Sequence, residues 1–134
     1  MSHFTVCPIG QVSRQNSGTQ IDIYTPYADG LLGLGKYSHI YVLYWLHEND
    51  TAEKRRILQV RPRGNEKNPL TGVFATHSPV RPNPIALSRC GILSIDRNRI
   101  YVDEIDALDG SPVLDIKGYF PYSDDSRIRV PSWI

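Results

Sequence analysis

The clearest pattern of hydrophobic and polar positions lies in residues 38–47, where both faces of an expected strand are apolar. Alternate residues share one face of a β-strand. One face carries Ile40, Val42, Tyr44 and Leu46. The other carries His39, Tyr41, Leu43, Trp45 and His47. A strand of this kind requires cover on both sides, from a second layer, a subunit or a ligand.

Other short runs rich in β-branched and aromatic residues are separated by Gly, Pro, Asn and Asp, which favours a β-rich fold. Residues 85–95 are expected to form a strand pair or one long bent strand with a bulge at Gly91. Strands are also predicted over 6–12, 20–24, 58–60, 72–76, 99–105 and 113–119. The last two are expected to form a hairpin or a close β connection. Residues 25–30 are expected to form a loop, and 50–58 a short helical turn. A capping box is not expected there, because Lys54 follows Thr51 by three residues.

Length and composition fit one domain spanning residues 1–134. The chain has 134 residues, of which 10 are Gly and 10 are Pro, a moderate turn content. It contains no apolar run near ~20 residues, so no membrane span is predicted. The N-terminus lacks the basic start and apolar run of a signal peptide, and a cytoplasmic location is expected.

A net charge of +1 excludes a uniformly basic coat for nucleic acid but allows a local basic patch. The densest positive region comprises Lys54, Arg55, Arg56, Arg61, Arg63 and Lys67. It is either a solvated face or a track for phosphates. No metal site is predicted, since Cys7 and Cys90 lie far apart and the histidines show no ligand spacing.

Two loops carry candidate chemistry. Three prolines, at 79, 82 and 84, stiffen the first loop, which holds His77, Arg81 and Asn83. This loop is either a binding site or a rigid crossover between strands. The second is the tip Leu108–Ser111, which offers backbone groups and the Asp109 carboxylate, or is an ordinary Asp-Gly turn. The glycines at 30, 33 and 35 have the wrong order for a dinucleotide-binding loop.

A set of motifs, taken together, resembles the TsaA-like family, which includes bacterial tRNA adenine-N6-methyltransferases. The resemblance extends from Pro8 to Tyr122. Its motifs are Tyr37-Ser38-His39-Ile40, Trp45-Leu46-His47, Gly72-Val73-Phe74-Ala75-Thr76, Arg81-Pro82-Asn83-Pro84-Ile85, Leu108-Asp109-Gly110 and Leu114-Asp115-Ile116-Lys117. The resemblance implies a mostly β fold, a single-sheeted β-barrel with short helical turns, that forms a homodimer. It also implies S-adenosylmethionine as cofactor and methylation of N6 of threonylcarbamoyl-modified adenosine 37 beside the tRNA anticodon.

The same resemblance implies the site. Cofactor contacts are expected from His47, Glu48, His77, Leu87, Leu108, Asp109, Gly110 and Ser111. The sequence departs from the family pattern at His77, which replaces a usual arginine, at Ala86 and Gly118, and in a shorter segment over 14–18. It also ends where bacterial members continue into a second domain.

The expected chemistry requires few protein groups, because the sulfonium already activates the methyl group and the protein must align the reactants. Arg81 is expected to bind a phosphate or the threonyl carboxylate. Asn83, Arg61, Arg63 and Asp115 are further substrate candidates, and His77 is the candidate general base. The splayed anticodon base would stack on aromatic side chains. The alternative is a non-catalytic module that binds S-adenosylmethionine or RNA and needs a partner.

Overall fold

The computed structural model describes residues 1–121 and 125–134, which form two compact units. The first unit contains Met1–His47 and Ile85–Phe120, and the second contains Glu48–Pro84 and Pro121–Ile134. Tyr122, where the family resemblance ends, lies outside the described residues.

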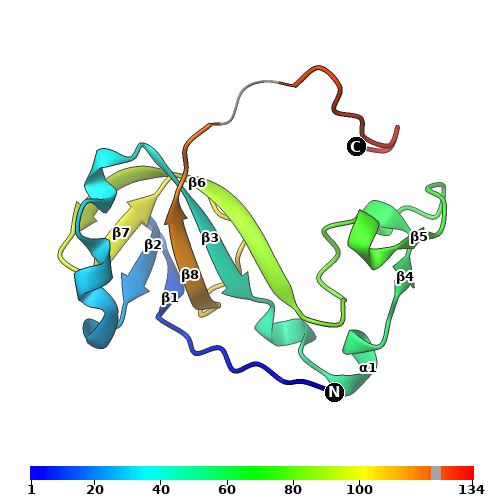
Figure 1. Ribbon diagram of the computed structural model, residues 1–134, viewed down its shortest axis with the longest axis horizontal. Coiled ribbons are helices and arrows are strands. Elements are labelled where there is room, and N and C mark those ends of the chain that lie inside the picture. Colours follow the sequence, from blue (N-terminus) through cyan, green and yellow to red (C-terminus); the bar gives the residue numbers. More distant parts are fainter. Residues whose placement is uncertain (122–124) are drawn as a thin grey trace. The chain divides into compact units, whose positions relative to one another are not determined.

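The first unit is a closed β-barrel of six strands. Figure 1 labels these strands. The strands are β1 (Gly10–Gln15), β2 (Gly18–Ile23), β3 (His39–Trp45), β6 (Ile85–Asp96), β7 (Arg99–Val102) and β8 (Pro112–Gly118). Around the barrel they follow the order β1-β2-β7-β6-β3-β8, and each pair of neighbours is antiparallel. Closure leaves no sheet edge exposed. The mostly β, single-sheeted barrel expected from the sequence is confirmed.

Period-two alternation fills the barrel with β-branched side chains. Six core residues have no exposed surface: Val12, Ile21, Ile40, Val42, Ile100 and Val113. The buried face of β3 matches the sequence pattern. Its other face is half-buried at Tyr41, Leu43 and Trp45, while His39 is exposed. Apolar side chains on this outer face of the barrel are therefore only partly covered.

Two short helices lie between β2 and β3, where a loop was expected over 25–30. They are η1 (Thr25–Leu31) and η2 (Leu34–Lys36), both 3-10 helices. Pro26 stands in the first turn of η1, where its missing N–H costs nothing. None of the helices in the described part of the chain is long and apolar enough to cross a membrane.

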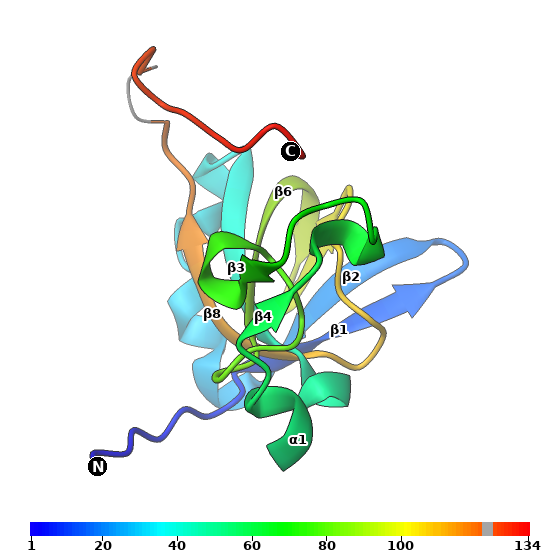
Figure 2. The same ribbon diagram turned by 90° about the vertical axis from the view of Figure 1, so that its right-hand side faces the viewer.

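The first predicted strand begins later than expected, at Gly10 instead of residue 6. Figure 2 shows β1 and β2 as a hairpin, in blue. The strand's start depends on glycine, since a Cβ at position 10 would lie 2.2 Å from the backbone oxygen of Asp22. The predicted bulge at Gly91 is displaced, because the register between β6 and β7 shifts between Ile92 and Ser94.

The predicted hairpin between 99–105 and 113–119 is wrong. β7 ends at Val102 and pairs with β2 and β6, whereas β8 pairs with β1 and β3. The intervening segment is held by the core, since Ile105 and Ala107 are buried there. Burial of these two side chains draws the segment away from β7.

The second unit has little regular structure. Its elements are α1 (Ala52–Arg55), β4 (Gln59–Val60), η4 (Pro62–Gly64), β5 (Thr71–Gly72) and η5 (Val73–Ala75). The short 3-10 helix η3 (His47–Asn49) begins with the last residue of the first unit's N-terminal segment and continues into the second unit. β4 and β5 pair antiparallel. The predicted short helix is present, and the Thr51 hydroxyl caps it by accepting from the Lys54 N–H at 3.1 Å.

The predicted strand over 72–76 is wrong beyond Gly72. The chain turns into η5, where both the N–H and the hydroxyl of Thr76 donate to the Val73 carbonyl, at 3.1 and 2.9 Å. These two bonds close a turn that an extended strand could not make.

Candidate functional site

The tip Leu108–Ser111, in the first unit, is a hydrogen-bonded turn. The Ser111 N–H and hydroxyl donate to the Leu108 carbonyl at 3.1 and 2.6 Å. Gly110 has φ +81° and donates its N–H to the Val12 carbonyl at 2.8 Å. The N–H groups of Gly110 and Ser111, which the sequence suggested could bind a ligand, therefore donate hydrogen bonds within the barrel instead.

Arg14 on β1 holds this tip in place, a role that the sequence reasoning missed. Its backbone N–H donates to Asp109 Oδ1 at 2.8 Å. Its guanidinium donates from Nε to the Ala107 carbonyl at 2.5 Å and from Nη2 to the Ile105 carbonyl. The sole signal in the sequence was the altered length of the segment over 14–18.

The exposed groups of the tip suit a nucleoside. Leu108 is 54% exposed and presents apolar surface. Asp109 is exposed, and no described residue donates to its Oδ2, which remains an acceptor for hydroxyl or amino groups. Nothing lies within 4 Å of the Cβ position of Gly110, so a ligand can approach the backbone there. These groups fit an adenosine moiety, with Leu108 beside its apolar surface and Asp109 accepting from its hydroxyls.

Two other predicted residues flank Leu43 on the outer face of the barrel. Leu87 on β6 and Asp115 on β8 are each the register partner of Leu43. Leu87 is 58% exposed, and Asp115 forms an exposed ion pair with Lys117 at 3.7 Å. His47 follows β3 and is exposed.

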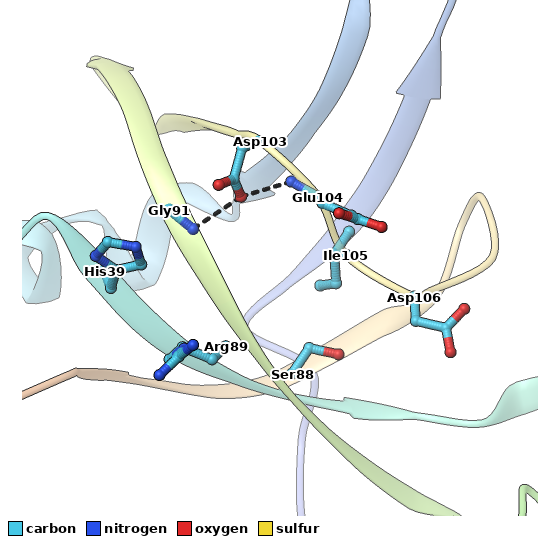
Figure 3. Close-up of a pocket in the computed structure, with 8 residues that line it drawn as sticks. All are labelled: His39, Ser88, Arg89, Gly91, Asp103, Glu104, Ile105 and Asp106. Atoms are coloured by element: carbon cyan, nitrogen blue, oxygen red, sulfur yellow. Dashed lines mark hydrogen bonds between the residues drawn. The ribbon is translucent and has the colours of Figure 1, made fainter. Parts of the chain in front are cut away.

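A pocket of about 320 Å³ lies between β6 and the segment over 103–106, and no sequence motif indicated it. Figure 3 shows its lining, with Ser88 between Arg89 and Asp106 in this view. Three carboxylates line it, from Asp103, Glu104 and Asp106, together with the cation of Arg89 and the ring of His39. The first of these acids is structural, because Asp103 Oδ1 accepts from the N–H groups of Gly91 and Glu104 at 2.8 and 2.6 Å.

The buried groups behind the pocket have shifted protonation equilibria. Burial, and secondarily the Asp103 carboxylate, raises the pKa of the Cys90 thiol to about 11. Burial also raises the pKa of Tyr44, although its hydrogen bond with Ser88 opposes the shift. Both groups are therefore neutral and structural at neutral pH.

In the second unit, hydrogen bonds reinforce the proline-rich loop. Arg81 Nη1 donates to the carbonyls of Thr76 and Ser78 at 3.2 and 3.1 Å. Arg55 reaches the loop from α1, with Nε 2.7 Å from the Pro82 carbonyl and Nη2 3.3 Å from Asn83 Oδ1. His77 is exposed on this loop. The expected stiffness thus has two sources, the prolines and these arginine contacts.

The basic segment is partly structural. Besides Arg55, Lys54 donates to the Glu48 carbonyl at 3.2 Å and Arg61 to the Asn68 carbonyl at 3.0 Å. Arg63 is exposed and has a left-handed backbone with φ 59°, which places it at the turn of η4. Some cations of this segment therefore stabilise its fold by bonding to backbone carbonyls, and the segment still carries a concentration of positive charge.

The predicted site residues divide between the two units. His47, Leu87, Leu108, Asp109, Gly110, Ser111 and Asp115 belong to the barrel, and Glu48, Arg61, Arg63, His77, Arg81 and Asn83 belong to the second unit. In residues 1–121 and 125–134, no three His, Cys, Asp or Glu side chains are grouped so that they could hold a metal ion.

Comparison with known proteins places the chain in a family. The sequence model of the family described as tRNA-methyltransferase O N-terminal domain matches residues 2–125. A probable S-adenosyl-L-methionine-binding protein of Methanocaldococcus jannaschii is 49% identical over 121 residues, covering 90% of this chain and 96% of that protein. An S-adenosyl-L-methionine-binding protein of Archaeoglobus fulgidus is 47% identical over 106 residues, covering 79% of this chain and 72% of that protein.

A solved structure agrees with the sequence comparisons. The crystal structure of TrmO from Pseudomonas aeruginosa superposes with a TM-score of 0.73 at 28% identity, covering 99% of this chain. The match spans 62% of that TrmO chain, so this chain corresponds to about two thirds of it. Sequence and structure therefore agree that the chain belongs to the tRNA-methyltransferase O N-terminal domain family.

Proposed function

We propose that this protein is an S-adenosylmethionine-dependent methyltransferase that acts on N6 of threonylcarbamoyl-modified adenosine 37, beside the tRNA anticodon. The observation that carries the proposal is the family match over residues 2–125. Relatives named as S-adenosyl-L-methionine-binding proteins support the choice of cofactor. The likeness to TrmO supports a tRNA substrate.

In the barrel, the tip supplies the groups for the nucleoside part of the cofactor. Asp109 Oδ2 accepts from ribose hydroxyls, and Leu108 packs against the base. Arg14 keeps the Asp109 carboxylate oriented through Oδ1 at 2.8 Å. His47 and Leu87 complete the proposed barrel contacts, while Gly110 and Ser111 set the backbone of the turn. When bound, S-adenosylmethionine supplies a methyl group activated by its sulfonium sulfur.

The second unit supplies the groups for RNA. Arg61, Arg63 and Arg81 bind phosphate or carboxylate oxygens of the substrate, and Asn83 adds an amide. Asp115 on the barrel is a further substrate contact. An imidazole nitrogen of His77 would take the N6 proton while N6 bonds to the methyl carbon and the bond from that carbon to sulfur breaks, because a ureido nitrogen is too weakly basic to attack readily. His77 and Glu48 are also assigned contacts with the cofactor.

A homodimer is part of the proposal. The outer face of β6 exposes Ile85 at 40% and Leu87 at 58%, next to the half-covered outer face of β3. Apolar side chains grouped on an exposed surface commonly mark an interface. Mass measurement by light scattering tests this part separately.

The proposal is tested by calorimetry and methyl transfer with the whole chain. The wild type is expected to bind S-adenosylmethionine saturably and to methylate tRNA carrying the threonylcarbamoyl group but not unmodified tRNA. Asp109→Ala is expected to weaken cofactor binding with the fold retained, whereas Asp96→Ala, an exposed acid on β6, leaves binding unchanged. A folded protein with neither activity contradicts the proposal. Binding without turnover on any tRNA favours the non-catalytic module instead.

A further inference from the structure

A cluster of aromatic and cationic side chains on the barrel has no role in the proposed site. At its centre is the ring of Tyr119, whose backbone N–H follows β8 and donates to the His39 carbonyl at 3.0 Å. Tyr41 packs edge-to-face against this ring with centroids 5.2 Å apart, and the His39 ring does so at 6.4 Å. The Arg89 guanidinium lies 5.1 Å from the centre of the same ring, and its Nη1 donates to the Tyr119 hydroxyl at 3.4 Å. Planar groups from three strands are therefore held together.

Strand register arranges part of this cluster as a row across three strands. Tyr41 on β3 is the register partner of Arg89 on β6 and of Lys117 on β8. These three residues are called the Tyr41 row below. Register partners point to the same face of a sheet, and the row faces outward because Ile40 and Val42 fill the core. Neighbouring strands are ~4.8 Å apart, so the backbones of the two cations are about 10 Å apart, with an aromatic ring between them.

The positive charge of the row is poorly compensated. In residues 1–121 and 125–134, no ion pair engages Arg89. Lys117 pairs with Asp115 at 3.7 Å, but both side chains are more than half exposed, and such pairs contribute little. Figure 3 shows Glu104 and Asp106 on the opposite side of the β6 ribbon from Arg89 in this view. A negatively charged group is therefore favoured on the side of β3 and β8, away from these acids.

The planar groups of the cluster are accessible and oriented. His39 and Arg89 are exposed, and Tyr41 and Tyr119 are half-buried. The hydrogen bond of 2.7 Å between Ser38 Oγ and His39 Nδ1 fixes the imidazole ring. Aromatic rings and guanidinium planes stack on unpaired bases, and cations between them bind phosphates.

RNA suits this row better than a second copy of the chain does. A symmetric interface brings the same surface patch from both subunits together, so a second copy would add its own cations to those of the row. RNA brings phosphates instead, which neutralise them. The row also lies close to the proposed site, since Arg89 is two residues along β6 from Leu87, or about 7 Å.

We propose that the Tyr41 row binds an unpaired nucleotide of the RNA substrate next to the target adenosine. The base stacks on the Tyr41 ring and the Arg89 guanidinium, and the adjoining phosphates bind the two cations. This inference rests on the proposed function for its choice of RNA as the partner. It gives the barrel its own RNA surface, in addition to the arginines of the second unit.

Fluorescence anisotropy of the whole chain with a labelled, unmodified anticodon stem-loop tests the row without requiring methyl transfer. Tyr41→Leu should weaken binding about ten-fold because one stacking contact is lost, whereas Tyr41→Phe keeps the ring and should stay within about two-fold. Arg89→Gln and Lys117→Gln should each weaken binding and lower the slope of log affinity against log salt by about 0.7. A fully paired duplex of the same length should bind the wild type and Tyr41→Leu equally, because its bases are not free to stack.

Arg99→Gln, which removes an exposed cation of β7, is the matched control and should lower the stem-loop affinity less than either cation of the row. Calorimetry with S-adenosylmethionine should give the same affinity in every variant. Loss of cofactor binding together with RNA binding would overturn the inference, since the change would then be one in the fold.

The remaining outcomes separate this inference from the proposed function. A wild type that does not bind the stem-loop, or row variants that bind it as the wild type does, overturn the inference while the proposed function stands. Tyr41→Leu that turns a dimer into a monomer in light scattering, with its RNA affinity kept, assigns the row to a second copy and also overturns it. A wild type that binds RNA through the row but neither binds S-adenosylmethionine nor methylates tRNA contradicts the proposed function and supports the row.

Discussion

Replacement of Arg14 tests whether the tip Leu108–Ser111 is held in place by the side chain that grips the segment before it. Arg14→Ala removes the guanidinium bonds to the Ile105 and Ala107 carbonyls. The bond from the backbone N–H to Asp109 can remain, because alanine keeps that group. The variant therefore isolates the side chain.

The expected loss follows from those two bonds. Hydrogen bonds from charged donors contribute about 1.5–3 kcal/mol each to stability. Both bonds of Arg14 are only part-buried, so each falls at or below the lower limit, and their combined contribution is about 2 kcal/mol. A change of that size increases the open fraction of the tip about 30-fold. The N–H groups of Gly110 and Ser111, which donate to the Val12 and Leu108 carbonyls, report this opening directly.

The assay is amide hydrogen exchange of the whole chain. Exchange at Gly110 and Ser111 is expected to accelerate about 30-fold in Arg14→Ala and by less in Arg14→Lys, which keeps one donor group. Arg99→Ala is the control, because this arginine of β7 is 55% exposed and pairs only at the surface with Asp22, at 3.3 Å. Exchange at the tip that is equal in the wild type and Arg14→Ala would refute the reasoning.

Four further predictions concern stability, thiol reactivity and pH dependence. Gly10→Ala should cost about 3 kcal/mol in urea unfolding, because its Cβ would lie 2.2 Å from the backbone oxygen of Asp22; a loss below about 1 kcal/mol contradicts this. Tyr44→Phe should cost about 1–3 kcal/mol in the same assay, since it removes two part-buried hydrogen bonds, and an unchanged midpoint would count against it. Cys7 is exposed and should react with a thiol reagent in the native state, whereas buried Cys90 should react only after unfolding. Burial raises the pKa of the Cys90 thiol from 9.0 to about 11. The stability that the fold gains from keeping this thiol neutral is therefore complete below pH 9 and is lost as the pH rises towards 11. In a Cys90→Ala variant, the free energy of unfolding should no longer show this part of the pH dependence.

The barrel strands show how much of the fold the local alternation of hydrophobic and polar residues can predict. The alternation over 38–47 predicted β3 and its buried face, because a period of two places Ile40, Val42 and Tyr44 on one side whatever they pack against. The ends of elements were less well predicted. The first strand begins at Gly10, where the backbone of β2 approaches too closely for a side chain. That approach depends on a neighbouring strand, which the local sequence does not contain.

The candidate site divides in the same way. Motifs indicated the tip and the proline-rich loop, because Gly110 and the prolines carry their backbone preferences with them. No motif indicated the pocket of Arg89, Glu104 and Asp106, since it is formed by β6 and a distant segment.

The sequence by itself determined that the chain is β-rich, which turn residues it uses and which family it resembles, because these follow from local propensity and from motifs. Only the tertiary structure decided strand order, since β7 and β8 are separated by a segment whose buried Ile105 and Ala107 compete with a simple hairpin. It also decided the role of Arg14, whose partners lie more than 90 residues away along the chain. Such long-range pairings depend on how the whole barrel closes, and no local pattern of residues encodes them.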